Sequence, residues 1–291
     1  MDRRDIPHDT GFVEVGDRCW VARHSALDVN VGVVAGERGL LVVDTSLSEV
    51  AGHRVVDDLR RLGRGEVVAV VNTHEHFDHV LGNAVLREEY GGPPIVAHET
   101  AAGRVREATE RVRRLYEADP GDPWAGDVVA SELVVPDQTF SSAWAVDLGD
   151  RFVEVVHPGR GHTGGDAVVR VPDAEVMFAG DLVEESGTPG FGEDSFPLEW
   201  PATLDLVLGL VDQTGVVVPG HGVPVGRAFV EAQRDSIGVV AETVRDLASR
   251  GLRPEQMADA AAWPYPVEDL RSAFRRGFDT LPHGARTLPL V

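Results

Sequence analysis

The sequence contains one cysteine, Cys19, and no lysine among its 291 residues. A single cysteine cannot form an internal disulfide bond or a metal site rich in thiolates. All 27 basic residues are arginines against 48 acidic residues, so the formal net charge is −21. Because this charge would repel nucleic acids and anionic lipid surfaces, we expect neither as a partner. Without lysine, the carboxylate of a ligand would have to be bound by arginine, backbone N–H groups or a metal.

Long hydrophobic runs are also missing from the sequence. No stretch approaches the roughly 18 apolar residues of a membrane-spanning helix. Residues 1–10 carry no apolar segment of the kind found in signal peptides, so we expect a cytoplasmic protein that acts on a small molecule. Hydrophobic residues make up 43% of the chain, which is typical of a globular protein with a sizeable core.

Short apolar runs alternate with helical patterns along residues 1–226, and a helical pattern continues over 227–291. A connection with proline and glycine at 119–126 divides the strands into two sets, which predicts two mixed sheets packed face to face and flanked by helices. We expect residues 1–226 to form this domain and 227–291 to form a helical extension packed on it, with a homo-oligomer as an open alternative. Strands are expected at 29–35, 40–44, 67–72, 95–97, 133–135, 143–148, 151–156, 167–171, 176–178 and 216–218, and helices at 47–62, 78–90, 99–117, 202–211, 227–250, 254–262 and 267–278.

One helix start carries a specific signal. Ser46, followed three residues later by Glu49, is typical of a capping box, and Gly63 would end the same helix.

Three histidines and an aspartate lie together directly after the strand predicted at 67–72. Beyond the end of a strand, residues two apart point the same way, so His74 and His76 can share one metal ion. Asp78 and His79 begin the next helix and can serve a second metal ion. The alternative is a solvated histidine-rich turn in which Asp78 caps the helix.

Three more segments place a possible metal ligand in a loop beside a short strand. They contain His162 within residues 158–166, Asp181 after the strand at 176–178, and His221 after the strand at 216–218. Glycines flank each one, as expected where the backbone approaches a compact site closely. Taken singly, each would more often be a hydrogen-bonded loop residue or a helix cap. Together with the first cluster they supply seven nitrogen and oxygen ligands, which suits two divalent ions of zinc, iron or manganese.

The series HxHxDH, GHT, GD and PGH, in this order, resembles the metallo-β-lactamase superfamily over about residues 11–225. This resemblance implies an αβ/βα four-layer sandwich. It also implies that two metal ions are bound, the first by His74, His76 and His162, the second by Asp78, His79 and His221, with Asp181 bridging the two. A bridging aspartate without a cysteine ligand is more similar to the glyoxalase II, lactonase and phosphodiesterase branches than to the drug-hydrolysing lactamases. The sequence GHTGGD departs from the GHTPG of glyoxalase II, which argues against a glutathione thioester as substrate.

The activity implied by the resemblance is that of a dinuclear metal-dependent hydrolase. A hydroxide bridging two divalent cations, zinc in the first instance and iron or manganese otherwise, would attack a small ester, thioester, lactone or amide. Asp78 is the candidate catalytic residue, orienting the nucleophile and relaying its proton. The alternatives are a mononuclear iron-dependent oxygenase similar to the persulfide dioxygenases, a phosphodiesterase for small molecules, and a metal-binding scaffold without catalysis.

Further residues are candidates for supporting roles. Asp44 either orients a ligand histidine or caps the following helix, and Asp166 either fixes His162 or closes its own turn. The long loop at 184–200 is rich in glycine and proline, and loops of this length are often functional. Four aromatic side chains are candidate walls of a substrate pocket, although they could instead pack against the C-terminal helices: Phe77, Phe191, Phe196 and Trp200.

Overall fold

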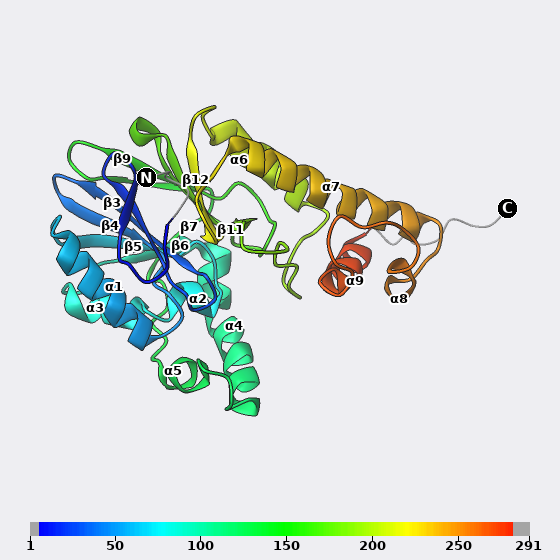
Figure 1. Cartoon of the computed structure of the whole chain (residues 1–291), viewed down its shortest axis with the longest axis horizontal. Coiled ribbons are helices and arrows are strands. Elements are labelled where there is room, and N and C mark those ends of the chain that lie inside the picture. Colours follow the sequence, from blue (N-terminus) through cyan, green and yellow to red (C-terminus); the bar gives the residue numbers. More distant parts are fainter. Residues whose placement is uncertain (1–5, 282–291) are drawn as a thin grey trace.

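Two β-sheets packed face to face make up the centre of the molecule in the computed structural model, which describes residues 6–281 (Figure 1). In the first sheet the strands follow one another in sequence order. Strands β1 to β4 are antiparallel to their neighbours, whereas β4 to β7 run parallel. Their bounds are β1 (Val13–Gly16), β2 (Cys19–Arg23), β3 (Asn30–Gly36), β4 (Gly39–Val43), β5 (Val67–Val71), β6 (Ile95–His98) and β7 (Gln138–Phe140).

Helices make the crossovers between the parallel strands of this sheet, as parallel pairing requires. Valine and leucine dominate β4 and β5 because these strands are covered on both faces. The crossover helices are α1 (Glu49–Leu62), α2 (Phe77–Val80), α3 (Asn83–Glu89), α4 (Glu99–Ala118) and α5 (Ala125–Ala130).

The second sheet has the strand order β13-β12-β11-β10-β9-β8. Its strands are antiparallel except for β11 and β12, which are parallel and connected through α6 (Trp200–Leu210). The strands are β8 (Ala143–Asp147), β9 (Phe152–Val156), β10 (Val168–Val171), β11 (Val176–Glu184), β12 (Val216–His221) and β13 (Val225–Gly226).

Apolar side chains pack in three layers that hold the helices and sheets together. The layer between the sheets includes Val43, Val155 and Phe178. A second layer, between the first sheet and helices α1 and α3, includes Val55 and Leu86. The third lies between the second sheet and the C-terminal helices. The order helix, sheet, sheet, helix confirms the predicted αβ/βα sandwich.

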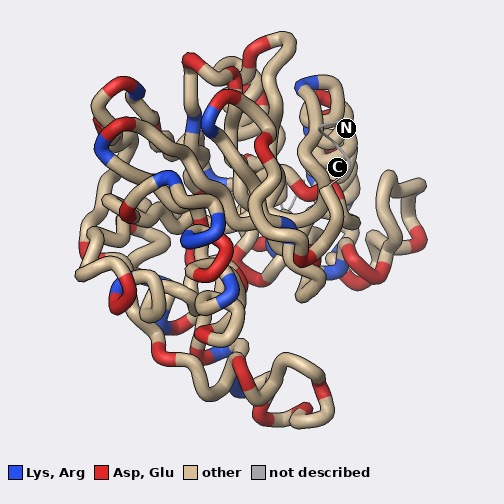
Figure 2. The backbone as a smooth tube through the Cα atoms, turned by 60° about the vertical axis from the view of Figure 1, so that its left-hand side comes forward, with Lys and Arg blue, Asp and Glu red and all other residues tan. Residues whose placement is uncertain are grey.

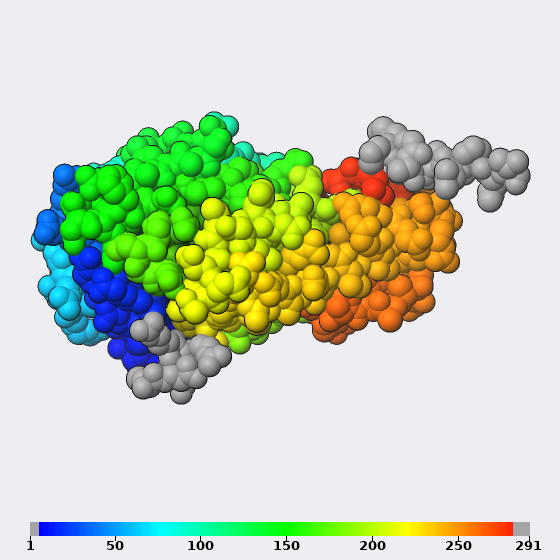
Figure 3. Space-filling view, turned by 90° about the horizontal axis from the view of Figure 1, so that it is seen from above, coloured from blue at the N-terminus to red at the C-terminus, as the bar shows by residue number. Residues whose placement is uncertain are grey.

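The last part of the described chain is helical, with α7 (Arg227–Ser249), α8 (Pro254–Met257) and α9 (Arg271–Thr280). Helix α7 packs beside α6 and continues beyond the sheets, where α8 and α9 lie against it (Figure 1). In the space-filling view these helices form one end of an elongated molecule (Figure 3). The predicted division at residue 227 coincides with the start of α7, while residues 1–5 and 282–291 lie outside the described residues. None of the described helices is long and apolar enough to cross a membrane.

Three local predictions are wrong. The cap of α1 is Ser48, whose side chain accepts a hydrogen bond from the backbone N–H of Ala51, so Ser46 does not form the capping box. The helix predicted at 78–90 is broken into α2 and α3, because the chain at Gly82 passes so close to Thr45 that a Cβ would lie 2.0 Å from its carbonyl oxygen. No strand forms at 133–135, and the edge strand is β7, which belongs to the first sheet.

Charged residues of both signs are distributed over all parts of the backbone, with acidic positions in the majority (Figure 2).

Candidate metal centre

The structure brings the seven predicted ligands together at one edge of the sandwich, where parallel strands end. His74 and His76 follow β5, and Asp78 and His79 lie in α2. His162 comes from the loop between β9 and β10. Asp181 lies within β11 and His221 ends β12. Their ligand atoms form two groups, within each of which all atoms lie within 4.8 Å of one another: His74, His76, His162 and Asp181, and then Asp78, His79 and His221.

In the first group the histidine rings surround one carboxylate oxygen. Nε2 of His162 lies 2.9 Å from Nδ1 of His76. Oδ2 of Asp181 lies 3.4 Å from Nε2 of His162 and 3.7 Å from Nε2 of His74. Three imidazole nitrogens and a carboxylate oxygen therefore converge on one point.

In the second group Oδ2 of Asp78 lies 3.6 Å from Nε2 of His79 and 3.3 Å from Nε2 of His221. Asp181 reaches this group as well, with Oδ1 at 3.2 Å from His79 and Oδ2 at 3.3 Å from His221. The carboxylate of Asp181 thus lies between the two groups.

Each of the five imidazoles is held by its outer nitrogen, which leaves the other nitrogen facing the centre of the cluster. Partners of this kind fix the ring orientation and the tautomer of metal-binding histidines. The pairs are His74 Nδ1 with Thr73 Oγ1 (3.0 Å), His76 Nε2 with Asp194 Oδ2 (3.2 Å), His79 Nδ1 with Asp44 Oδ2 (2.9 Å), His162 Nδ1 with the Gly190 carbonyl (2.8 Å) and His221 Nδ1 with the Leu27 carbonyl (2.7 Å).

Several buried polar atoms in the cluster have no hydrogen-bond partner among the described residues: Nε2 of His74, Nε2 of His79 and Oδ1 of Asp181. Buried polar atoms without a partner are costly and require an explanation. Here they are imidazole nitrogens and a carboxylate oxygen that face one another, which are ligand types that divalent zinc, iron and manganese accept. The residues present therefore fit a pair of divalent cations.

Two of the three histidines in the first group are held neutral, whereas burial lowers the pKa of the third, His76, and Asp194 raises it above the ordinary value. Burial lowers the pKa of His162 to about 4 and holds that of His74 well below the ordinary value. Metal ligation requires an unprotonated imidazole nitrogen, so these two rings are in the required state at neutral pH.

The second group concentrates negative charge. Burial opposes ionisation of Asp78, but His79 and His221 lower its pKa to about 2. The same histidines hold the pKa of Asp181 well below the ordinary carboxyl value, again against the effect of burial. In turn, the two carboxylates raise the pKa of His79 and His221 well above the ordinary imidazole value although burial lowers it. The pocket around Asp181 thus attracts positive charge strongly.

The backbone near the cluster is shaped to admit these side chains. A Cβ on Gly220 would lie 1.8 Å from Oδ1 of Asp181, and a Cβ on Gly180 would lie 2.7 Å from Thr73. Gly180 also has a positive φ of 52°, which favours glycine. Asp44 adopts a φ of 61°, an uncommon conformation for an aspartate that is typical of functional sites.

Asp44 and Asp166, for each of which the sequence allows two roles, differ in what they bind. Asp44 accepts hydrogen bonds from the backbone N–H and the hydroxyl of Thr73, both at 2.8 Å, and contacts Nδ1 of His79. It is therefore placed to orient His79 and does not cap α1. Asp166 accepts hydrogen bonds from Gly161 and Thr163, so it closes its own turn, and no hydrogen bond joins it to His162 among the described residues.

The four aromatic candidates lie in different surroundings. Trp200 is 0% exposed in the core, with its ring centroid 5.9 Å from that of His162, and its Nε1 donates to the Leu182 carbonyl, so its side chain does not reach a pocket surface. Phe191 packs on Trp200 but also lines, with His162, a hollow of about 490 Å³.

The other two aromatic rings lie against neighbouring helices and arginines. Phe77 contacts Tyr116 of α4, with ring centroids 5.7 Å apart. The ring of Phe196 lies beneath the guanidinium groups of Arg160 and Arg276.

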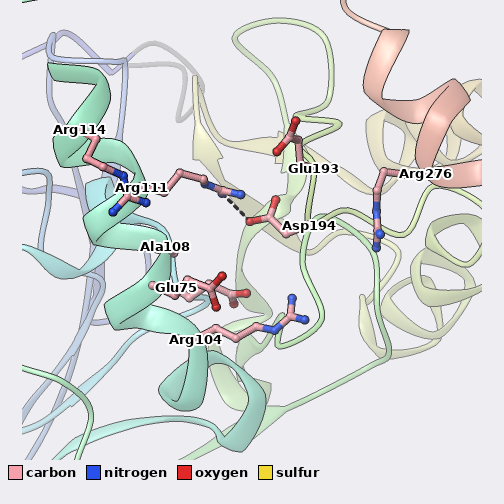
Figure 4. A pocket seen from close by; sticks show the side chains of 9 residues that line it. Glu75, Arg104, Ala108, Arg111, Arg114, Glu193, Asp194 and Arg276 are labelled. Carbon is pink, nitrogen blue, oxygen red and sulfur yellow. Dashed lines mark hydrogen bonds and ion pairs between the residues drawn. The ribbon is translucent and has the colours of Figure 1, made fainter. Parts of the chain in front are cut away.

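Two acidic residues at the site are not predicted from the sequence. Asp194 binds His76 and also accepts from Arg111 of α4 at 2.8 Å (Figure 4). These two partners hold its pKa below the ordinary value despite burial. Glu184 lies near Asp181 and His221, and burial raises its pKa to about 7. Both residues lie in the loop predicted at 184–200, which the sequence marks as functional, but no pattern there distinguishes Glu184 or Asp194 from the rest of the loop.

Comparison with known proteins agrees with this geometry. A model of the metallo-beta-lactamase superfamily matches residues 24–221, more than half of the chain. The chain belongs to the metallo-beta-lactamase superfamily. Metallo-beta-lactamase type 2 of Bacillus cereus is 25% identical over 233 residues, which cover 76% of this chain and 81% of that protein. Acyl-coenzyme A thioesterase MBLAC2 of Homo sapiens is 26% identical, with 72% of this chain and 75% of that protein covered.

Among solved structures, the sec-alkylsulfatase Pisa1 from Pseudomonas sp. has the same fold, with a TM-score of 0.73 and 19% sequence identity. The match covers 97% of this chain and 52% of that one, so the chain spans about half the length of this alkylsulfatase. The chain is therefore a metal-dependent hydrolase. This conclusion follows from its family, from its cluster of histidines and aspartates, and from the hydrolase names of its relatives.

Proposed function

We propose that this protein is a dinuclear metal-dependent hydrolase that acts on a small ester, thioester, lactone or amide. The observation that carries the proposal is the position of Asp181, whose carboxylate contacts histidines of both ligand groups. One carboxylate shared by two groups favours a pair of ions over a single one. Zinc is the proposed metal, with iron or manganese as alternatives, because the ligands are imidazoles and carboxylates without thiolate.

Seven side chains would hold the two ions, with the first group of histidines on one, Asp78, His79 and His221 on the other, and Asp181 on both. A pair of divalent cations supplies a water molecule of lowered pKa, from about 15.7 towards about 7, and polarises the carbonyl that is attacked. Asp78 is placed to orient the attacking oxygen and to accept its proton, since its Oδ2 faces the centre of the cluster. Asp44 and Asp194 hold His79 and His76 in position.

The substrate is proposed to be a small molecule that enters beside His162, where the hollow lined by Phe191 opens. The named activities of the relatives support acyl substrates, since they include a thioesterase and lactamases. An alkyl sulfate is included among the substrates to be tested because of the alkylsulfatase match. We also propose a cytoplasmic protein without nucleic-acid or membrane partners, as the composition favours.

Metal analysis combined with a substrate panel tests this proposal. We expect about two zinc ions per purified chain and hydrolysis of at least one of an aryl ester, an acyl thioester, a lactone, a β-lactam or an alkyl sulfate. Asp181→Asn should reduce metal content and lower kcat/KM by 100-fold or more, whereas Asp205→Asn, at an exposed carboxylate on α6, should leave both unchanged.

Two results would contradict the proposal. One is about one iron per chain together with oxygen uptake, which would favour the mononuclear oxygenase. The other is a fully zinc-loaded protein that hydrolyses none of the panel.

A further inference from the structure

A charged cavity of about 290 Å³ lies beside the metal centre, between helix α4 and the segment that contains Asp194, with α9 opposite (Figure 4). Its described lining residues include four arginines and four acidic residues, so their formal charges cancel. The lining is therefore formally neutral, whereas the chain as a whole carries a charge of −21.

Arginines with unused hydrogen-bond donors line the outer part of this cavity. Arg104 and Arg114 are exposed on the same helix, α4, and neither forms a hydrogen bond or ion pair with any residue between 6 and 281. The two arginines are ten residues apart, about 15 Å along the helix, with Arg111 between them (Figure 4). Across the cavity, Arg276 donates its Nε to the Ser195 carbonyl, and its guanidinium stacks on Phe196. Such guanidinium groups are suited to bind a carboxylate.

The inner part of the cavity carries acceptors without donors. Glu75 is 1% exposed, and neither of its carboxylate oxygens has a hydrogen-bond partner in the described part of the chain. Oδ1 of Asp194 is likewise buried and without a partner there. Burying a carboxylate without donors is costly, and a group of this kind in a cavity indicates that a ligand supplies the donors. A primary ammonium group provides three N–H donors and a compensating charge.

We propose that this cavity binds a small zwitterion, with an ammonium group against Glu75 and a carboxylate against Arg104. Two observations carry the assignment: the carboxylate of Glu75 is buried without a hydrogen-bond donor among the described residues, and the guanidinium of Arg104 is exposed without an ion pair there. The exposed Glu107 and Glu193 also line the cavity. A ligand with one charge alone would leave either Glu75 or Arg104 unmatched.

The cavity shares a wall with the metal centre, because Asp194 also contacts Nε2 of His76 at 3.2 Å. If the proposed hydrolase activity holds, the zwitterion is part of the substrate, and the substrate class is an ester, thioester or amide of an amino-acid-like compound. This last step rests on the proposed function, whereas the binding site itself does not.

Calorimetric titration of the zinc-loaded protein with three matched molecules tests the binding site without turnover. The molecules are 4-aminobutanoate, pentanoate, which lacks the ammonium group, and butylammonium, which lacks the carboxylate. We expect 4-aminobutanoate to bind at least tenfold more tightly than either of the others. Equal affinity of pentanoate and 4-aminobutanoate would overturn the role of Glu75, and no binding of 4-aminobutanoate at 10 mM would overturn the site.

Substitutions assign the two charges to the two walls. Arg104→Ala should weaken 4-aminobutanoate about tenfold and leave butylammonium unchanged, and Glu75→Gln should weaken both molecules that carry ammonium. The matched control is Arg106→Ala, at an exposed arginine of the same helix outside the cavity. If Arg106→Ala and Arg104→Ala have the same effect, the cavity is not the site.

Two further measurements separate this proposal from others. Metal content of the Glu75 variant is measured in parallel, because Glu75 adjoins two metal-ligand positions. If that variant loses metal, Arg104→Ala decides the question. Binding of 4-aminobutanoate without hydrolysis of any substrate would refute the proposed function and leave this site standing. Hydrolysis of a substrate without binding of 4-aminobutanoate would refute this site and leave the proposed function standing.

Discussion

Replacing Gly220 by alanine tests the position of Asp181 through a single added methyl group. A Cβ at this position would lie 1.8 Å from Oδ1 and 3.0 Å from Cγ of Asp181, and also 3.0 Å from its backbone nitrogen. Carbon and oxygen need roughly 3.5 Å, so the carboxylate would have to withdraw by more than about 1.5 Å. Metal–ligand distances tolerate only about 0.2 Å, and so Asp181 could no longer reach both groups of histidines.

The expected result is a loss of metal and activity without a loss of the fold. A displacement of about 1 Å in an active site lowers the rate by about 100-fold, which corresponds to about 2.7 kcal/mol. We expect Gly220→Ala to lower kcat/KM by at least this factor and to retain fewer than two zinc ions, as measured by elemental analysis. Far-UV circular dichroism would show that the strands persist.

The matched control is Gly209→Ala in helix α6, where an added Cβ meets nothing within 4 Å. Alanine is the better helix former by about 0.5–1 kcal/mol, so this variant should unfold at a slightly higher temperature with unchanged activity. If Gly220→Ala binds two zinc ions and retains wild-type kcat/KM, Asp181 does not lie where the structure places it.

Three further predictions concern the surroundings of the centre and the core. Asp194→Asn should weaken zinc binding 10- to 100-fold because His76 loses a charged partner, while Glu193→Gln should not; equal metal affinities of the two variants would refute this role. Cys19 is 0% exposed and burial raises its pKa to about 12, so iodoacetamide should label it only after unfolding, and rapid labelling of the native protein would contradict its burial. Burial lowers the pKa of His24 in the folded protein. Below about pH 6.5 the unfolded chain therefore binds a proton at His24 that the folded chain does not bind. The free energy of unfolding should fall as the pH drops below this value. His24→Gln should reduce that slope by up to about 1.4 kcal/mol per pH unit in urea unfolding, and an unchanged slope would show that His24 does not contribute.

The layers and the ligand cluster could be predicted because their signals are local. Runs such as Val67–Val71 read as buried strands, and the glycine at position 63 ends α1 in the left-handed conformation. The metal-ligating side chains follow such strands directly. Since the carboxyl ends of the parallel strands β4, β5, β11 and β12 meet at one edge, side chains at those ends come together.

What could not be predicted depends on contacts between distant segments. The interruption between α2 and α3 comes from the close approach of Gly82 to Thr45, which lies 37 positions earlier. Asp194 reaches His76 from a loop 118 residues away, and no pattern around an acidic residue in such a loop specifies that contact. Trp200 follows a long loop, which favours a position in a pocket, but its side chain is 0% exposed and packs against the rings of Phe191 and His162.

The central claim is that two metal ions are bound by one cluster with Asp181 between them. Anomalous X-ray diffraction at the zinc absorption edge, from crystals of the zinc-loaded protein, measures this directly. We predict two anomalous peaks, one beside His162 and one beside His221, with the carboxylate of Asp181 in contact with both. A single peak, or peaks at any other place in the chain, would contradict it.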